Sequence, residues 1–348
     1  MKTDGTVTFP AWISAAGASP VVSSRVRLAR NRSGLPFPGS AGTTDLNRVI
    51  EDVRGFSQSL PRWSFERLTE VDALKRAVWI ERGLISRETA AHPRSIGVAK
   101  SGDESLSILA NDEDHFRLQV IRGGLALDDA LKAAQDLDGK LSRRVQYALH
   151  PAWGYLTTYP TNVGTGLRVS VLLHLPALAL TREIAEVLHA VVHVGLTVGG
   201  LHGHSADSPS AFFQLSNQIS LGRTEEEIAR HLEGVARQAV DREEKAREKV
   251  LREKRVMLED KLGRALGILA GCRFLDLEDA LELLSTLRLG VDLGLVSAAR
   301  ARQVRELTLL IQSGHLQTKV GKILPLEEQD RARAELVRRG FKLKANKL

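Results

Sequence analysis

The chain has 348 residues, of which 43% are hydrophobic and 26% are charged, and this composition is typical of a soluble globular protein rather than a disordered one. At about 150 residues per domain, the length predicts roughly two domains. The formal net charge is +7, which raises the question of a nucleic-acid-binding function. Residues 331–348 alone contain seven basic side chains and one acidic side chain, so the rest of the chain is close to neutral. The aromatic content of 5% and the lack of a basic recognition helix argue against a nucleic-acid partner.

The cysteine content and the hydropathy pattern limit the compartment. The single cysteine, Cys272, excludes an intramolecular disulfide and thiolate zinc clusters, so a reducing cytoplasm is the expected location. The most apolar stretch, residues 169–180, is interrupted by His174 and Pro176 and is too short to cross a bilayer. The N-terminal residues contain no continuous apolar segment. We therefore expect no export signal and no membrane anchor.

The first part of the chain mixes short strands with a few helices. The runs that predict strands are residues 96–99, 106–110, 116–121 and 169–174. Turn-forming residues 101–104 join the first two runs into a hairpin. Apolar periodicity predicts helices over residues 128–143 and 181–196. Because strands and helices do not alternate strictly, the pattern favours an α+β fold with a mostly antiparallel sheet flanked by helices.

The last third of the sequence is helical throughout. Thr224 and Glu227 form a capping box that predicts a long charged helix to about residue 255. Asp276 and Ser297 are expected to begin further helices, the second of which ends near Gly314. Their leucine stripes need an apolar partner, which predicts a small all-α bundle. A subunit interface and packing within one chain both account for such stripes.

Two segments carry arginine and carboxylate groups in suggestive patterns. Arg25 and Arg27 alternate along an extended run, so their guanidinium groups lie on one face and suit a polyphosphate. A solvated edge strand would have the same alternation. Asp112, Glu113 and Asp114 come directly before a predicted strand, where a carboxylate can orient a nucleophile or hold a metal. A solubilising acidic loop is the alternative there.

Two further patterns are less specific. The glycine-rich residues 162–166 allow a ligand to approach the backbone, but they match neither the Walker motif nor the dinucleotide-binding motif. His189 and His193 are four residues apart on a predicted helix, and His202 and His204 follow. A zinc site of this kind lacks the glutamate of the HExxH motif, so ordinary core or surface histidines are the preferred interpretation.

Four segments in the same order resemble the catalytic domain of the phosphagen (guanidino) kinases, and most closely the bacterial protein arginine kinases of the McsB family. They are SSRVRLARN from Ser23, NDEDHFR from Asn111, PTNVGTGLR from Pro160 and FFQLSNQISLG from Phe212. The resemblance covers nearly the whole chain. It implies a phosphagen-kinase-like catalytic domain in residues 1–255 and an all-α C-terminal domain in residues 256–348 for dimerisation and phosphoarginine sensing.

The resemblance implies transfer of the γ-phosphate of ATP to the guanidinium of arginine residues in proteins. Mg²⁺ would be bound with the nucleotide, with no metal held directly by the protein. The implied catalytic residues are Glu113, which pairs with the guanidinium, and Asp207, on a loop that closes over the substrate. The implied ATP-binding residues are Ser23, Ser24, Arg25, Val26, Arg27, Arg117, Arg168, Val169, Ser170, Val171 and Leu172. The implied substrate-side residues are Tyr159, Asn162 and His204, and the implied phosphoarginine-sensing residues are Asp330 and Arg333.

Two features favour protein substrates over small guanidino compounds. The SSRVRLAR segment begins at Ser23 without the helical lid domain that precedes it in phosphagen kinases, so the site is expected to stay open to an arginine on a protein surface. The helical C-terminal part is a feature of the bacterial family. The implied partners are proteins with surface arginines, a second copy in a homodimer, an activating adaptor and a protease–chaperone complex.

Several positions depart from the family pattern. Tyr159 replaces a cysteine, Gly83 a histidine, Gly199 an arginine, and Asp207 and His204 replace glutamates, while Gln329 replaces the first arginine of an RDxxRA motif. These departures keep a second interpretation open, in which a catalytically degenerate phosphagen-kinase-like protein acts as a phosphoarginine-binding or scaffold protein.

Overall fold

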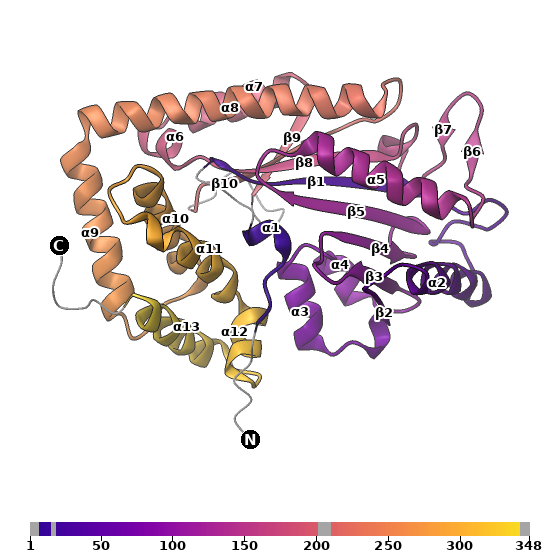
Figure 1. Ribbon diagram of the computed structural model, residues 1–348, viewed down its shortest axis with the longest axis horizontal. Coiled ribbons are helices and arrows are strands. Elements are labelled where there is room, and N and C mark those ends of the chain that lie inside the picture. The colour runs from indigo at the N-terminus through magenta and orange to yellow at the C-terminus, as the bar shows by residue number, and fades with distance from the viewer. Residues whose placement is uncertain (1–6, 15–18, 201–209, 342–348) are drawn as a thin grey trace.

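The central element of the protein is one eight-stranded sheet. The computed structural model describes residues 7–14, 19–200 and 210–341 (Figure 1). The strand order is β2-β3-β4-β5-β1-β8-β10-β9, and every neighbouring pair is antiparallel. The strands are β1 Val21–Arg30, β2 Trp63–Arg67, β3 Gly97–Ser101, β4 Leu106–Ala110, β5 Phe116–Gly123, β8 Leu167–His174, β9 Leu196–Gly200 and β10 Phe212–Asn217. The expected α+β class with an antiparallel sheet is confirmed.

Helices cover one face of this sheet and form its main core. The helices on this side are α2 Thr43–Gln58, α5 Leu127–Ser142, α7 Ile184–His193 and α8 Glu225–Glu253. Their apolar stripes pack against strand residues such as Val26, Val169 and Val171, all fully buried. The capping box of Thr224 and Glu227 at the start of α8 is present as predicted. Burial of this face leaves the opposite face of the central strands for polar side chains.

The C-terminal region is a separate group of helices with its own core (Figure 1). It consists of α9 Arg255–Gly271, α10 Leu277–Asp292, α11 Ala301–Leu310, α12 Ser313–Val320 and α13 Leu326–Gly340. Leu258, Leu284 and Ile311 are fully buried in this core, so the leucine stripes pack within the chain. Helix α12 also packs against α3, Ala73–Glu81, which joins this bundle to the sheet.

The shorter elements complete the fold. They are α1 Ala11–Ser14, α4 Arg87–Ala91, α6 Pro176–Thr181, the two-stranded ribbon β6 Leu149–His150 and β7 Gly154–Tyr155, and the 3₁₀ turns η1 Leu68–Glu70, η2 Pro160–Asn162 and η3 Ala298–Arg300. None of the helices in the described ranges combines the length and apolar character needed to cross a bilayer.

In place of the single helix expected over residues 181–196, the structure has the end of one helix, a second helix and the start of a strand. Helix α6 ends at Thr181, and Arg182 then takes a left-handed conformation with φ of 62°. Helix α7 follows, and from Leu196 the chain runs as β9 alongside β10. The prediction was wrong at both ends, because a proline begins a helix earlier and strand pairing takes the last residues.

One expectation for the C-terminal third was also wrong. The helix predicted to run from Ser297 to Gly314 ends at Leu310, because Gln312 is extended and a new helix begins at Ser313. The basic tail expected over residues 331–348 is helical as far as Gly340, within α13. Its charge is partly paired, since Arg331 and Arg339 lie beside glutamates one turn earlier.

Candidate active site

The sheet brings a row of arginines together on the face opposite the main core. Strand β1 is paired on both sides, so the solvated-edge interpretation of its arginines is wrong. Across to β8, Arg25 is paired with Ser170 and Arg27 with Arg168. Across to β5, Arg27 is paired with Gln119. Because antiparallel partners share a face, these polar side chains form one surface across three strands.

The arginines on this surface carry an excess of positive charge. Neither Arg25 nor Arg168 has a carboxylate partner within the described residues, whereas Arg117 is paired with Asp112. Burial, and then repulsion from Arg117, lowers the pKa of Arg25 to about 10. Burial also lowers the pKa of Arg27, which Arg25, Arg117 and Arg168 repel. A surface of this kind is electrostatically complementary to a polyphosphate.

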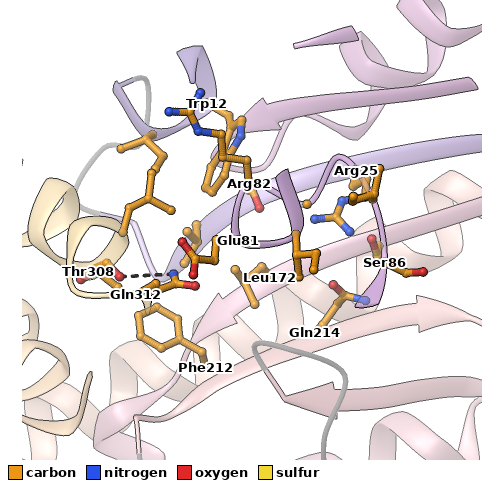
Figure 2. A pocket seen from close by; sticks show the side chains of 18 of the residues that line it. Trp12, Arg25, Glu81, Arg82, Ser86, Leu172, Phe212, Gln214, Thr308 and Gln312 are labelled. Atoms are coloured by element: carbon orange, nitrogen blue, oxygen red, sulfur yellow. Dashed lines mark hydrogen bonds between the residues drawn. The ribbon is translucent and has the colours of Figure 1, made fainter. Parts of the chain in front are cut away.

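The remaining predicted ATP-binding residues divide between the two faces of the sheet. Ser23, Ser170 and Leu172 line a cleft together with Arg25 and Arg27 (Figure 2). Val26, Val169 and Val171 face the main core instead. Ser24 is also on that side: its hydroxyl donates to the carbonyl of Gly124 at 2.8 Å and accepts from the amide of Ala126 at 3.0 Å. The resemblance to the family does not tell which of these residues lie on which face of the sheet, whereas the two-residue period of a strand does.

A short hydrogen-bonded chain holds Arg27. Its Nε donates to Oε1 of Gln119 at 2.8 Å, and Nε2 of Gln119 donates to the carbonyl of Gly83 at 2.9 Å. Gly83 has a φ of +71°, and a Cβ built there would lie 2.6 Å from a terminal nitrogen of Arg25. A side chain at Gly83 would therefore have to displace the end of the Arg25 side chain. The sequence analysis missed Gln119, although the two-residue period of β5 places it on the same face as Arg117.

The acidic segment before β5 presents one unpaired carboxylate. Asp112 is paired with Arg117 and also accepts from Oγ1 of Thr89 at 2.6 Å. Asp114 is buried and accepts from the side chain of Asn31 and from a backbone amide. Glu113, between them, is exposed and its carboxylate has no partner among the described residues. Loss of solvent around it, followed by repulsion from Asp112, raises the pKa of Glu113.

The predicted substrate-side residues lie beside this carboxylate. Tyr159 is 48% exposed, and the charge of Glu113 is the main cause that raises the pKa of its phenol. Asn162 ends the 3₁₀ turn η2 that follows Tyr159. The predicted residues His204 and Asp207 lie outside the described residues. Tyr159 and Glu113 are therefore brought close together, on a surface open to solvent.

The glycines of the loop that follows serve local packing. Gly164 has a φ of +109°, and a Cβ there would lie 2.9 Å from Cα of Leu221. Gly166 has a φ of +64°, and a Cβ there would lie 2.5 Å from the carbonyl oxygen of Ala29. Both positions need glycine because backbone approaches backbone, so a ligand is not required to explain them.

The cleft beside the arginines extends to the helical C-terminal region. It has a volume of about 450 Å³. Figure 2 shows Trp12 and Phe212 on opposite sides of it, with Arg25 near one end and Thr308 near the other. Sequence analysis did not assign Trp12 or the C-terminal residues to a site, because no local pattern indicates which helix closes a cleft in the sheet.

The two predicted phosphoarginine-sensing residues contact each other in α13. Arg333 is 2% exposed and donates to Asp330, to the carbonyl of Ile311 at 2.8 Å and to the carbonyl of Leu275 at 2.9 Å. These bonds fasten α13 to the rest of the bundle. Arg333 is thus fully engaged within the chain, and Gln329 donates to the carbonyl of Leu324 at 2.9 Å.

A candidate metal centre does not form from the residues described. Within the described ranges, no three His, Cys, Asp or Glu side chains come close enough to hold an ion. His189 and His193 lie on α7 as predicted, whereas His202 and His204 fall outside the described residues.

Comparison with known proteins gives matches over both parts of the chain. Residues 46–246 match the ATP:guanido phosphotransferase C-terminal catalytic domain, and residues 255–348 match the protein-arginine kinase McsB C-terminal domain. The protein-arginine kinase of Symbiobacterium thermophilum is 41% identical over 94% of this chain and 95% of its own length. That of Bacillus subtilis is 38% identical over 94% of this chain and 91% of its own length.

Solved structures share the fold at lower identity. Lombricine kinase is similar with a TM-score of 0.58 and 20% identity, over 70% of this chain and 72% of that one. The duplicated taurocyamine kinase of Schistosoma mansoni is similar with a TM-score of 0.57 and 22% identity, over 67% of this chain and 36% of that one. These likenesses confirm the phosphagen-kinase-like fold. From the two family matches and the nearly full-length relatives, the chain belongs to the protein-arginine kinase family and is a phosphotransferase enzyme.

Proposed function

We propose that this enzyme transfers the γ-phosphate of ATP to the guanidinium of arginine residues in proteins. The observation that carries the proposal is the row of arginines on β1, β5 and β8 beside the unpaired carboxylate of Glu113. A phosphoryl transfer needs positive charge around the transferred group and a positioned nucleophile. Here the arginines lie on the sheet, and Glu113 lies in the loop directly before β5.

The arginines are proposed to hold the phosphates of ATP. Arg25, Arg27, Arg117 and Arg168 supply guanidinium forks that match phosphate oxygens and neutralise the charge that develops on the γ-phosphoryl group. Ser23, Ser170 and Leu172 complete the adjoining cleft. Mg²⁺ would be bound through the phosphate oxygens of the nucleotide, where it contributes further positive charge.

Glu113 is proposed to orient the substrate guanidinium. A free guanidinium has a pKa above about 12, so a carboxylate does not deprotonate it before the reaction. Paired with the carboxylate, one terminal nitrogen can be aimed at the γ-phosphorus. As the nitrogen–phosphorus bond forms, the bond from the γ-phosphorus to the bridging oxygen breaks, ADP leaves, and the proton of the nitrogen can pass to Glu113. The raised pKa of Glu113 favours this acceptance of a proton. Asp207 is proposed as a second carboxylate toward the substrate.

Arginine on a protein surface is the proposed substrate class. Glu113 and Tyr159 are both exposed, so a guanidinium at the end of a side chain can reach the carboxylate from solvent. Tyr159, Asn162 and His204 are proposed to contact the substrate side of this opening. A planar phenol beside the carboxylate can stack on a guanidinium.

Further proposals concern the C-terminal region and the partners. We propose a domain boundary at residues 255 and 256, close to the point where α8 ends at Glu253 and α9 begins at Arg255; the last turn of α8 already contributes Val250 to the helical core. A homodimer through the helical region is proposed from the exposed apolar side chains of Val256, Met257 and Phe274. From the family we also propose phosphoarginine sensing at Asp330 and Arg333. We further propose an activating adaptor, a protease–chaperone partner and a cytoplasmic location, where ATP is available.

Transfer to a protein is tested by incubating the enzyme with Mg-ATP and either casein or free arginine. We expect acid-labile phosphoarginine on casein by mass spectrometry, and at least about tenfold less product from free arginine at the same arginine concentration. No phosphoarginine on casein, with normal binding of Mg-ATP, would instead support a catalytically degenerate scaffold. Preferential reaction of free arginine would contradict the proposed substrate class.

A further inference from the structure

A second hollow in the surface lies beside the ribbon of β6 and β7. It has a volume of about 450 Å³ and is formed by this ribbon, the loop before β8 and residues 220–227. Its apolar lining comes mainly from Ala152, Trp153, Tyr155 and Leu221. We call this hollow the ribbon groove. It shares no lining residue with the cleft beside the arginines, so it is a separate feature of the surface.

The ribbon groove exposes large apolar side chains to solvent. Trp153 is 58% exposed and Leu221 is 50% exposed. Leu149 and Ile219, which are close to them in the chain, are exposed as well. The indole of Trp153 is stacked on the ring of His150, with the ring centres 4.6 Å apart and the planes at 25°. Large apolar side chains gathered on one exposed surface indicate a site of contact with another molecule.

Hydrogen bonds join the ribbon groove to the substrate side of the active site. The hydroxyl of Ser220 donates to the carbonyl of Val163 at 3.0 Å, and the amide of Tyr155 donates to the carbonyl of Gly164 at 2.8 Å. Both acceptors follow closely after Tyr159, the phenol beside the carboxylate of Glu113. The chain from Tyr159 to Gly164 spans about 18 Å at most. An extended polypeptide can therefore reach from Glu113 to the groove with about five residues.

Buried contacts hold the base of the ribbon groove in place. The guanidinium of Arg30 lies 3.6 Å from the centre of the Tyr155 ring and donates to the carbonyl of Thr165 at 2.8 Å. A Cβ at Gly154 would lie 2.5 Å from the carbonyl oxygen of Gly164, so the ribbon packs directly on the loop before β8. The groove thus has a defined shape before any partner binds.

The polar groups at the start of α8, on the other side of the groove, are already engaged. Thr224 and Glu227 each accept a hydrogen bond from the other's backbone amide, at 3.1 Å and 2.8 Å. Glu225 accepts from the side chain of Gln135 at 2.9 Å and lies 3.6 Å from Arg30. A helix start can bind an anion through its free amides, but here the capping box occupies them. An apolar side chain therefore fits the groove better than a phosphate does.

The ribbon groove lies far from the region proposed for the homodimer. Figure 1 shows the ribbon of β6 and β7 at the opposite end of the molecule from the C-terminal helices. The exposed side chains proposed for the dimer, Val256, Met257 and Phe274, belong to that helical region. The groove therefore stays open in such a homodimer, next to the place where an arginine of a protein enters.

We propose that the ribbon groove binds an apolar side chain of the protein substrate, within about five residues of the arginine that is phosphorylated. The inference rests on the proposed function, since a protein substrate is what brings a polypeptide to Glu113. A leucine or an aromatic ring of the substrate covers Trp153 and Leu221, which removes apolar surface from water. The groove then provides affinity that free arginine lacks, and it selects arginines that have an apolar neighbour.

The test measures the phosphorylation of synthetic peptides that contain one arginine among glycine and serine residues. In a series of these peptides, a single leucine replaces serine at each position up to about six residues before and after the arginine. The kcat/KM for phosphoarginine formation with Mg-ATP is measured on the full chain for the wild type, Trp153→Ser and Leu221→Ser. The matched control is Val192→Ser, on α7, because Val192 is 57% exposed and lies outside the groove.

For the wild type, we expect leucine at one or two positions on one side of the arginine to raise kcat/KM by about fivefold over the leucine-free peptide. A gain of this size corresponds to partial burial of one apolar side chain. The gain should be lost in both groove variants and should persist in Val192→Ser. A gain that persists undiminished in both groove variants would overturn the inference.

Two further outcomes separate this inference from the proposed function and from another occupant. Equal phosphorylation of all the peptides by the wild type would refute the inference alone, whereas no phosphoarginine on any peptide would count against the proposed function. Light scattering of the wild type and Leu221→Ser at the same concentration should give the same mass. A lower mass for the variant would show that a second copy of the chain occupies the groove, and would overturn the inference.

Discussion

Glu81 and His315 are 234 positions apart in the chain, yet Nδ1 of His315 lies 2.5 Å from Oε2 of Glu81. The same carboxylate accepts from the backbone amides of Gly314 at 2.6 Å and His315 at 2.9 Å. On the other side of the ring, Nε of Arg82 donates to Nε2 of His315 at 3.0 Å, so Nδ1 carries the proton and donates to Glu81. Helix α12 is thereby bound to α3, directly before Gly83 and the arginine surface.

This contact leads to a prediction for Glu81→Gln. An amide has one acceptor oxygen in place of two, so at least one donor of α12 is left buried without a partner. We expect the variant to lose about 1 to 3 kcal/mol of unfolding free energy, measured by urea denaturation. The control is Glu70→Gln, at an exposed position, which should change stability by less than about 0.5 kcal/mol. Equal stability of the two variants would contradict the role of this contact.

Alanine variants of Gly83 and Gly124 test whether the lack of a side chain at Gly83 sets the position of the Arg25 guanidinium. Both have a φ of +71°, but only at Gly83 would a Cβ meet a guanidinium, whereas nothing lies within 4 Å at Gly124. Alanine at either position should cost about 1 to 2 kcal/mol of stability because of the left-handed backbone. Only Gly83→Ala should displace Arg25 and raise the KM for ATP, by about tenfold, in steady-state assays of phosphoarginine formation. A similar KM in both variants would show that Gly83 does not set the position of Arg25.

Gln119 is predicted to position Arg27. In Gln119→Met the guanidinium loses the acceptor at Oε1, and we expect the KM for ATP to rise by about fivefold to tenfold. The double variant with Arg27→Ala separates positioning from a general effect on structure. If Gln119 acts through Arg27, its substitution should add little once Arg27 is absent. Fully additive losses in the double variant would mean that Gln119 acts independently.

The buried His115 predicts a loss of stability in mild acid. Its Nδ1 accepts from the amide of Arg32 at 3.1 Å, and burial lowers its pKa from 6.5 to about 4. In the unfolded chain His115 therefore binds a proton below pH 6.5, whereas in the folded protein it binds one only below about pH 4. The stability is fully present above pH 6.5 and decreases as the pH falls toward 4, by about 2 kcal/mol at pH 5. Urea denaturation at pH 7.5 and pH 5 measures this difference.

The variant His115→Asn tests whether the loss of stability at pH 5 comes from His115. Asparagine keeps an acceptor near the amide of Arg32 and has no titration between pH 4 and 7.5. We expect the difference between the two pH values to shrink by about 2 kcal/mol relative to the wild type. An undiminished difference would place the acid sensitivity in other groups.

Sequence patterns anticipated the parts of the site that depend on strand alternation. Arg25 and Arg27 share a face because they are two residues apart on one strand. The same alternation separates Ser24 from the cleft, which the family comparison alone did not reveal. The position of Glu113 before β5 was visible in the sequence, but its lack of a partner was not. Asp112 is engaged by the nearby Arg117 and by Thr89, 23 positions away, and Asp114 is engaged by Asn31, 83 positions away.

The parts that escaped prediction depend on long-range packing. Trp12 and Arg305 are nearly 300 positions apart, and only the docking of α11 beside α1 brings them to one cleft. The break between α11 and α12 was also hidden, because Glu81 stabilises the new helix start at Gly314 from another part of the chain. Local propensity contains no information on such contacts, since the partner residue is not nearby in sequence.

The acid limb of the pH–activity profile, where activity falls at low pH, should reflect the protonation of Glu113. Its pKa is raised by loss of solvent and by Asp112, so its carboxylate form is lost at a higher pH than for an ordinary glutamate. Activity should therefore fall as the pH drops through this raised value, and kcat/KM should follow the ionised fraction. In Asp112→Asn the repulsion is removed, and we expect the acid limb to move to lower pH. A limb that stays in place would show that another group controls it.

The central claim, that Glu113 acts on the guanidinium beside a phosphate-binding arginine surface, is tested most directly by one paired measurement on Glu113→Gln. Mg-ATP affinity by calorimetry and phosphoarginine formation on casein by mass spectrometry are compared with those of the wild type. Our account predicts unchanged affinity for Mg-ATP together with a loss of phosphoarginine of at least about 100-fold. Phosphoarginine formation at the wild-type rate in Glu113→Gln would contradict it.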